Sequence, residues 1–369
     1  MQESAFVGPL IRMLRLEKNW SQETLCRGIC AVSYLSKIEQ GRVAATDEMI
    51  GLLLERLDCR WAAEEQEKAG NMCEEVYEAV FAGEKLERYL SAMASWDEML
   101  GPWYLDLSVL RAYAENDLSE IPEQMQLLLN NRQSCLVWLI KGEPEQAMRI
   151  YPCALATMEA GIKAYQEGNY IRAMELLQQS YDMACQDGSV SLMLTCQTFL
   201  ASCYSDLRRL DDMRRHYRMA RRIANALGEE EMAKAIEYNF AATQLECGDA
   251  QGAYRFFSAL ENGSVLDLHK LAISCEKLGR TEEAKAALDR AEPAAEGLEK
   301  QMCALVRYRL EHPAYLRDET YGKLLIDTFE RLRRERPAGY ARFHLPWVEE
   351  WCAANRQYRL AYEITKSFT

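Results

Sequence analysis

Short polar side chains occur at helical spacing near the start of the sequence, where they could form hydrogen bonds with another molecule. The apolar residues Ala31, Leu35 and Ile38 recur at intervals of four and three, which predicts a helix over 32–40 with one buried stripe. The side chains expected outside that stripe, or just beyond the helix, are Val32, Ser33, Ser36, Lys37, Gln40 and Arg42. Hydroxyl, amide and cationic groups in this arrangement can bind the base edges and phosphate oxygens of DNA.

The preceding stretch has the signals of a shorter helix that ends in a tight turn. Ser21 can cap the start of this helix through its hydroxyl group. Leu25 and Cys26 supply its buried side, and Gly28 suits the left-handed position at its end. In a helix-turn-helix the second helix enters the major groove with its N-terminus first. Ser21 and Gln22, at the start of the first of the two helices, are then placed to touch phosphate.

Further helices are expected on both sides of this pair. Helical spacing of apolar residues extends over 4–18, and Thr46 with two acidic residues opens a last helix whose leucines close the core. The whole of residues 1–62 is expected to form a five-helix helix-turn-helix domain. The alternative is a helical hairpin with similar starts and ends that binds nothing.

Residues 8–57 resemble the helix-turn-helix domain of the phage-repressor (XRE-like) superfamily, through Ser21-Gln22-Glu23-x-Leu25 and Leu35-Ser36-Lys37-Ile38-Glu39-Gln40-Gly41. The stretch 28–39 is similar to the variant found in peptide-pheromone regulators of the Rgg and PlcR type. Two departures affect the docking geometry: Ala31 replaces a frequent capping serine, and Ala44-Ala45 replaces the usual Pro-Ser. The resemblance implies a homodimeric transcription regulator that binds operator DNA and a short signalling peptide.

Charge is distributed unevenly along the chain. The formal net charge is -13 at pH 7, yet residues 1–60 hold equal numbers of basic and acidic residues, so the remainder carries the whole net charge. An acidic body binds phosphate backbones poorly. Any contact with nucleic acid is therefore expected within the neutral N-terminal stretch.

Composition and motifs argue against several other classes of protein. The 13 cysteines are odd in number, scattered and without a Cys-x-x-Cys pair, so they are expected to be reduced core residues with no metal site. No long apolar run or charged-then-apolar leader occurs, so a cytoplasmic protein is expected. Phosphate-loop, nucleophile-elbow, His-Glu-x-x-His and dinucleotide glycine patterns are absent from the sequence, so neither an enzyme nor a cofactor is expected.

A helical repeat is indicated after a charged linker helix over 63–75. A glycine five residues before an alanine recurs in the stretch 76–369, at Gly142…Ala147, Gly168…Ala173, Gly248…Ala253 and Gly279…Ala284, with weaker copies at Arg208…Met213 and Arg356…Ala361. In a helical hairpin the glycine ends the first helix, and the alanine lets the second helix approach closely. The intervals scatter about the roughly 34 residues of a tetratricopeptide repeat. The stretches resemble such repeats, and the expected fold is all-α, with a tetratricopeptide-like α-solenoid after the N-terminal domain.

Such an array curves, and its first helices line a concave face suited to an extended peptide or a partner helix. The polar side chains expected on that face are Gln197, Tyr204, Asn239, Gln244 and Lys270. Asn239 is favoured, because an amide within an apolar run can bind a peptide backbone through both its donor and its acceptor. Each of these residues could instead be a solvated or internally hydrogen-bonded polar group.

The C-terminal region holds an aromatic cluster that offers either a dimer surface or the core of a terminal cap: Tyr340, Phe343, Trp347 and Trp351. Together the features predict a transcription regulator whose repeat domain, 76–369, senses a ligand, a short peptide by resemblance, and dimerises. A symmetric homodimer would bind palindromic double-stranded DNA. The alternative function is a tetratricopeptide scaffold that holds a protein partner and has no operator-specific DNA binding.

Overall fold

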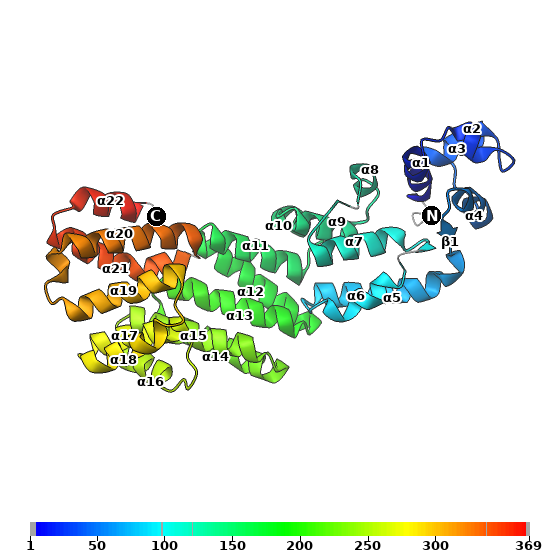
Figure 1. The fold of residues 1–369 in the computed structure, drawn as a ribbon. Coiled ribbons are helices and arrows are strands. Elements are labelled where there is room, and N and C mark those ends of the chain that lie inside the picture. The colour runs from blue at the N-terminus through cyan, green and yellow to red at the C-terminus, as the bar shows by residue number, and fades with distance from the viewer. Residues whose placement is uncertain (1–4, 97–98, 120, 337, 367–369) are drawn as a thin grey trace. The chain divides into compact units, whose positions relative to one another are not determined.

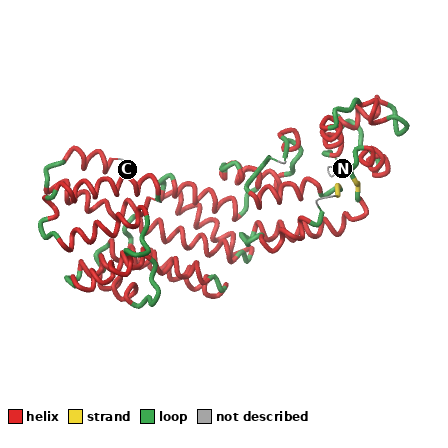
Figure 2. The backbone as a smooth tube through the Cα atoms, viewed as in Figure 1, coloured by secondary structure: helices red, strands yellow, loops and turns green. Residues whose placement is uncertain are grey.

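The computed structural model describes residues 5–96, 99–119, 121–336 and 338–366. The expected all-α fold class is confirmed, since helix accounts for 76% of the structure. Across the described ranges the chain forms 22 α-helices and a single two-stranded sheet (Figures 1 and 2). None of these helices is both long and apolar enough to cross a membrane.

The N-terminal segment contains four α-helices where five were expected. They are α1 (Val7–Glu17), α2 (Gln22–Cys26), α3 (Val32–Glu39) and α4 (Asp47–Arg56). Asp58 has a φ of 63°, which turns the chain out of the helical path after α4. The next residues form strand β1 (Arg60–Trp61), which pairs in parallel with β2 (Met99–Leu100). The expected fifth helix is therefore replaced by a short strand whose partner lies far along the chain.

Strand pairing and an aromatic stack connect the N-terminal segment to the helix that follows β2. The backbone N–H of Ala62 donates to the carbonyl of Leu100 at 2.8 Å. Phe6, just before α1, stacks on Tyr104 at the start of α7 (Tyr104–Glu115), with ring centroids 5.8 Å apart. Both contacts lie within one compact unit of the molecule, so the N-terminal segment packs directly against the first part of the helical body.

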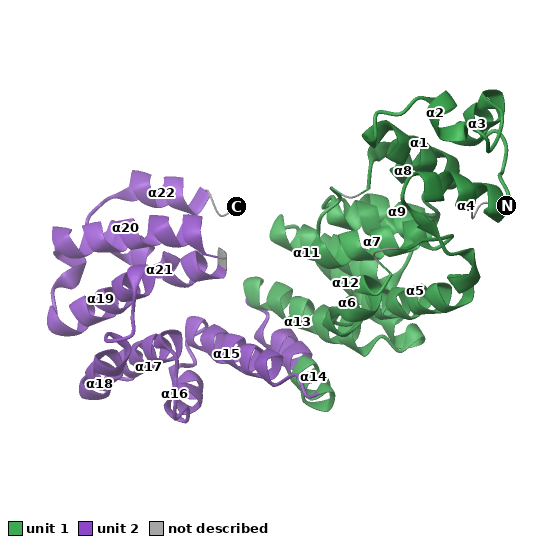
Figure 3. Ribbon diagram, turned by 45° about the vertical axis from the view of Figure 1, so that its right-hand side comes forward, with its two compact units in different colours: residues 1–207, 218–227 green, residues 208–217, 228–369 purple. Residues whose placement is uncertain are grey.

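The chain divides into two compact units, coloured separately in Figure 3. The first unit comprises residues 1–207 and 218–227, and the second comprises 208–217 and 228–369. After β1 the first unit continues through η1 (Ala63–Glu65), α5 (Gln66–Phe81), α6 (Glu87–Ala94), β2, α7, α8 (Glu123–Gln126), α9 (Asn131–Ile140), α10 (Pro144–Ile150), α11 (Ala154–Gln166), α12 (Tyr170–Asp187) and α13 (Val190–Asp206). Helix α14 (Leu210–Leu227) contributes residues to both units.

The second unit holds the remaining helices. They are α15 (Glu230–Glu246), α16 (Ala250–Ser258), α17 (Val265–Lys277), α18 (Thr281–Ala291), α19 (Gly297–Glu311), η2 (Tyr315–Arg317), α20 (Glu319–Glu335), α21 (Ala338–Ala354) and α22 (Tyr358–Lys366). Their apolar faces form one core that includes Leu271, Val306, Phe329 and Val348. Helix after helix packs on its neighbour in sequence, which is the arrangement of a helical repeat.

The glycine and alanine of the recurring motif behave as the sequence predicts. The glycines at 142, 168, 248 and 279 all have a positive φ and follow α9, α11, α15 and α17. The alanines at 147, 173, 253 and 284 are fully buried in the helices that come next. In the weaker copies Arg208 and Arg356 also adopt a positive φ, of 56° and 57°. The body is thus a series of helical hairpins turned at equivalent positions, while its relation to tetratricopeptide repeats stays a prediction.

The C-terminal aromatic cluster lies in and against the core of the second unit. Phe343 and Trp347 are 8% and 7% exposed, and Tyr340 and Trp351 pack against the same core. Trp351 also covers Gly322 of α20, where a side chain would collide with the indole ring. This placement favours the alternative in which the cluster is an internal core, and a dimer surface there stays a prediction.

Candidate nucleic-acid interface

Helix α2 begins at a serine cap and ends at a turn held by α4. The Ser21 hydroxyl accepts the backbone N–H of Thr24 at 3.0 Å, which satisfies one of the free donors at the helix start. Gly28 has a φ of 73°, as the turn into α3 requires. Arg56 donates to the carbonyl of Leu25 at 3.1 Å and to that of Arg27. A guanidinium from α4 therefore fixes the turn that sets the position of α3.

Helix α3 presents a polar face to solvent. Leu35 and Ile38 are buried, whereas Val32, Ser33, Lys37 and Gln40 are exposed and Ser36 is half-buried. The amide of Gln40 donates to the Ser36 hydroxyl at 3.2 Å, so these two side chains hold each other in place. Arg42 is exposed in the turn after the helix. The face carries hydrogen-bond donors, acceptors and two cations. Such groups can form hydrogen bonds with base edges and ion pairs with phosphates.

A buried ion pair anchors α3 to the rest of the segment. Arg15 of α1 donates to both carboxylate oxygens of Glu39, at 2.7 and 2.8 Å, and each residue is almost fully buried. The same guanidinium donates to the carbonyl of Trp20 at 2.6 Å. These hydrogen bonds to Glu39 raise the pKa of Arg15. Gln22 donates to Glu39 at 2.8 Å, so α1, α2 and α3 meet at one carboxylate.

The sequence reasoning missed this pair and assigned Gln22 to phosphate alone. Its amide nitrogen is engaged with Glu39, while its side chain remains half-exposed. The spacing in the sequence could have indicated this pair. Glu39 lies four residues after Leu35, and Arg15 four residues after Ile11, so each charged residue falls on the buried face of its helix. A charged residue at a core position of two neighbouring helices indicates a buried pair.

Some basic residues of the segment are neutralised within the protein, and others are available to phosphate. Lys18 pairs with Asp58 at 2.8 Å, and Arg60 with Glu64 at 3.0 Å. Four cations are exposed and form no ion pair with any residue in the described ranges: Arg12, Arg27, Lys37 and Arg42. Sequence reasoning named the last two and missed Arg12 and Arg27, which lie outside α3.

The residues predicted to bind a peptide are divided between the two units. Gln197 is buried and Tyr204 half-buried on α13 of the first unit. In the second unit Asn239 is exposed on α15, and Gln244 donates to Asp249 at 2.9 Å. Lys270 is 4% exposed, and its ammonium lies 2.7 Å from the centroid of the Phe343 ring. Contact between Lys270 and a ligand would require the core around it to open.

Comparison with known proteins identifies the N-terminal segment. Residues 11–62 match a family model described as helix-turn-helix. This match covers α2, the turn and α3, so the chain carries an XRE-type helix-turn-helix domain followed by a predominantly helical body. The domain supports a DNA-binding transcription regulator and is consistent with binding to double-stranded DNA. Neither a curated protein nor a solved structure matches the chain.

Proposed function

We propose that this chain is a sequence-specific transcription regulator that contacts operator DNA through the exposed face of α3, and whose helical body senses a ligand. The observation that carries the proposal is the helix-turn-helix match over residues 11–62, together with the polar face of α3 within it. Helix α3 would lie in the major groove with its N-terminus leading. Ser33 and Lys37 would then contact base edges, and the Ser21 end of α2 would approach the phosphate backbone.

Binding as a homodimer would give the domain the affinity that one copy lacks. Its first 60 residues are neutral overall, and the body carries the net charge of -13. A single copy therefore gains little from phosphate attraction, whereas two linked copies raise the effective concentration of the second. A twofold dimer would bind a palindrome.

The proposed ligand is a short signalling peptide, and the action of the protein is binding rather than catalysis. Support for the peptide comes from the resemblance of 28–39 to the pheromone regulators and from the tendency of helical arrays to bind extended segments. The exposed Asn239 is a residue that could contact a peptide backbone.

The DNA-binding proposal is tested by selecting bound sequences from random duplex DNA with the full-length protein. The selected duplex is then used in electrophoretic shift experiments with the wild type, Ser33→Ala and Lys37→Ala. If Lys37 contacts a base, its loss costs about 1–3 kcal/mol and relaxes the preference at one position. Lys300→Ala removes an exposed cation from α19 and serves as the matched control.

Two results would count against the proposal. One is that no sequence is enriched by the wild type at modest salt, which would favour the scaffold alternative. The other is that Lys37→Ala and Lys300→Ala behave alike on the selected duplex, which would remove α3 from the interface.

A further inference from the structure

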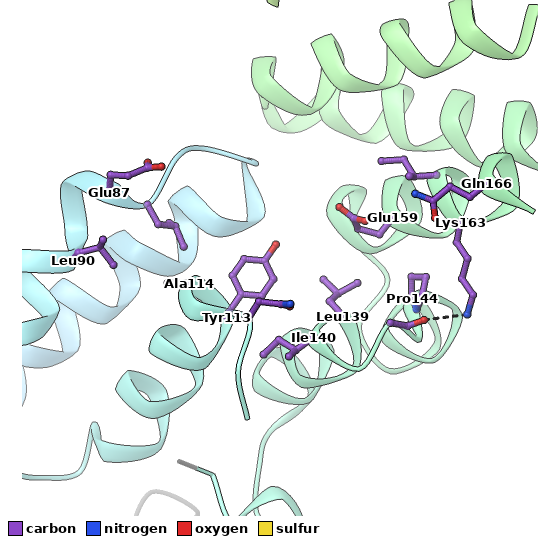
Figure 4. Close-up of a pocket in the computed structure, with 14 residues that line it drawn as sticks. Glu87, Leu90, Tyr113, Ala114, Leu139, Ile140, Pro144, Glu159, Lys163 and Gln166 are labelled. Atoms are coloured by element: carbon purple, nitrogen blue, oxygen red, sulfur yellow. Dashed lines mark hydrogen bonds between the residues drawn. The ribbon is translucent and has the colours of Figure 1, made fainter. Parts of the chain in front are cut away.

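A pocket in the first unit is lined by none of the residues that the sequence marks as ligand contacts. It encloses about 640 Å³ and is lined by residues of α6, α7, α9, α10 and α11, and by the turns beside them (Figure 4). Pockets that hold small ligands typically measure about 300–1,000 Å³. The volume therefore suits a small organic molecule, or one or two side chains of a peptide.

Much of the pocket wall is aliphatic. Leu86 and Leu90 line it from the α6 side, Leu139 and Ile140 from α9, and Ile162 from α11. Leu90 is 46% exposed, so part of this aliphatic surface is in contact with water. A ligand with an apolar body would cover this surface and remove it from water, which is a favourable contribution to binding.

One carboxylate in the pocket has no partner. Glu159 of α11 is half-buried and forms no hydrogen bond or ion pair with any residue that the structure describes. Burial raises the pKa of Glu159 above its ordinary value. A carboxylate among aliphatic side chains loses hydration without compensation, and a cation placed beside it would restore that loss.

Tyr113 of α7 shares this space with Glu159. Figure 4 shows the phenol of Tyr113 and the carboxylate of Glu159 pointing into the pocket from facing elements. Burial raises the pKa of Tyr113, and the charge of Glu159 adds to the increase. The ring offers a π face to a cation, and its hydroxyl offers a hydrogen bond beside the carboxylate.

The one basic side chain among the described lining residues, Lys163, forms its contacts with groups other than Glu159. Lys163 is one turn after Glu159 on α11, yet its ammonium donates to the carbonyl of Gly142 at 3.0 Å. It also lies 3.4 Å from Glu143 and 3.7 Å from Glu145. Glu87, exposed at the α6 side, adds a second carboxylate to the lining. The lining thus holds two carboxylates, Glu87 and Glu159, that form no ion pair with any residue in the described ranges.

We propose that this pocket binds a cationic nitrogen carried on an apolar body, with Glu159 as its counter-charge and Tyr113 packed against it. The inference rests on the proposed ligand-sensing function and names the chemistry of the ligand. A free hydrophobic amine and a basic side chain within a short apolar peptide share this chemistry. The site differs from the one predicted on α13, α15 and α17.

Helix α7 contacts both the pocket and the DNA-binding domain. Tyr113 lies near the C-terminal end of α7, and Tyr104 at its start stacks on Phe6 beside α1. A helix of this length spans roughly 18 Å at about 1.5 Å per residue. A ligand that draws Tyr113 toward Glu159 would therefore act on an element that also borders the helix-turn-helix.

The test is calorimetric titration of the full-length protein with two pairs of probes. The first pair is 4-phenylbutylammonium and the neutral 4-phenylbutanol. The second is an acetylated, amidated pentapeptide of four leucines around one arginine, and the same peptide with citrulline. Binding of the charged member only supports the site, and the tighter of the two charged probes identifies the source. Equal binding of charged and neutral members, or of neither, overturns it.

Glu159→Gln should weaken binding of the charged probe tenfold or more, and Tyr113→Phe less. Glu115→Gln removes an exposed carboxylate from α7 outside the lining and is the matched control. Affinity of the wild type should fall as the pH is lowered through the raised pKa of Glu159, and the glutamine variant should lose this dependence. Because the variant removes a poorly solvated charge, it should melt no lower than the wild type. Unchanged affinity in Glu159→Gln would overturn the proposal.

Electrophoretic shift experiments with and without the bound probe measure the affinity for operator DNA. Their results distinguish a failure of the pocket proposal from a failure of the proposed regulator function. Charged-probe binding with an altered operator affinity supports both. Charged-probe binding by a protein that selects no DNA sequence supports the pocket and overturns the regulator. Operator binding by a protein that ignores all four probes overturns the pocket and leaves the regulator standing.

Discussion

At the scale of single residues, the carboxylate of Glu39 joins three helices of the DNA-binding domain. It accepts both hydrogen bonds from Arg15 and a third from Gln22. Glu39→Ala would leave the guanidinium buried without its partner, so we expect the domain to lose about 3–5 kcal/mol of stability. Urea unfolding of the full-length protein measures this, with the exposed Glu17→Ala as control.

The double variant Arg15→Met, Glu39→Leu should recover most of that loss, because both charges are replaced by apolar groups of similar volume. A single variant as stable as the wild type would show that water reaches the pair. DNA affinity should follow the stability of the domain in these variants, since neither side chain lies on the exposed face of α3.

At the scale of elements, α1 and α3 approach each other at Gly8. A methyl group at this position would overlap the backbone carbonyl of Ile38, which is fixed within α3. We expect Gly8→Ala to cost about 1–3 kcal/mol or more and to weaken DNA binding by tilting α3. Gly51→Ala, in the middle of α4 with nothing within 4 Å of the new methyl group, should instead stabilise the domain by about 0.5–1 kcal/mol. Thermal melting of the two variants should shift in opposite directions, and equal shifts would contradict the packing described.

The elements divide into those that local signals predict and those that depend on distant partners. Helices α1 to α4 have apolar periodicity, and α2 and α4 also begin at a side-chain cap. These helices and the glycine turns of the body were predictable, because each depends on a few neighbouring residues. Strand β1 has only two residues and forms by pairing with β2, so it is too short for an alternation of apolar and polar residues to predict it. The pocket around Glu159 was missed for a similar reason, since its walls combine side chains of five helices and their turns between residues 86 and 166.

At the scale of the whole molecule, stability should depend on pH through two buried histidines in the second unit. His269 and His344 stack with ring centroids 5.9 Å apart, and both are almost fully buried. Burial lowers the pKa of His269 well below its ordinary value and that of His344 to about 3, and the charge of the neighbouring Lys270 adds to both shifts. The unfolded chain therefore takes up protons near pH 6.5 that the folded unit excludes.

It follows that this contribution to stability is complete above about pH 6.5 and is lost as the pH falls below that value. Each histidine should cost about 1.4 kcal/mol per pH unit, so urea unfolding at pH 5.5 should show a loss of roughly 3 kcal/mol against pH 7.5. His344→Gln should reduce the slope, while the exposed His312→Gln should leave it unchanged. A wild type equally stable at both pH values would mean that the folded unit takes up these protons as well, which would contradict the burial described.

The parallel pairing of β1 with β2 also limits how the N-terminal domain can be exchanged between proteins. Residues 60–61 at its end are completed by residues 99–100, and α5 and α6 lie in the loop that the two strands close. Phe6 likewise has its aromatic neighbour at Tyr104. A chimera that takes only residues 1–62 from this chain would contain β1 without its partner strand β2. It would also contain Phe6 without Tyr104, on which the ring stacks. The segment that can be exchanged as a whole therefore extends from the N-terminal domain through α7, and it includes both strands.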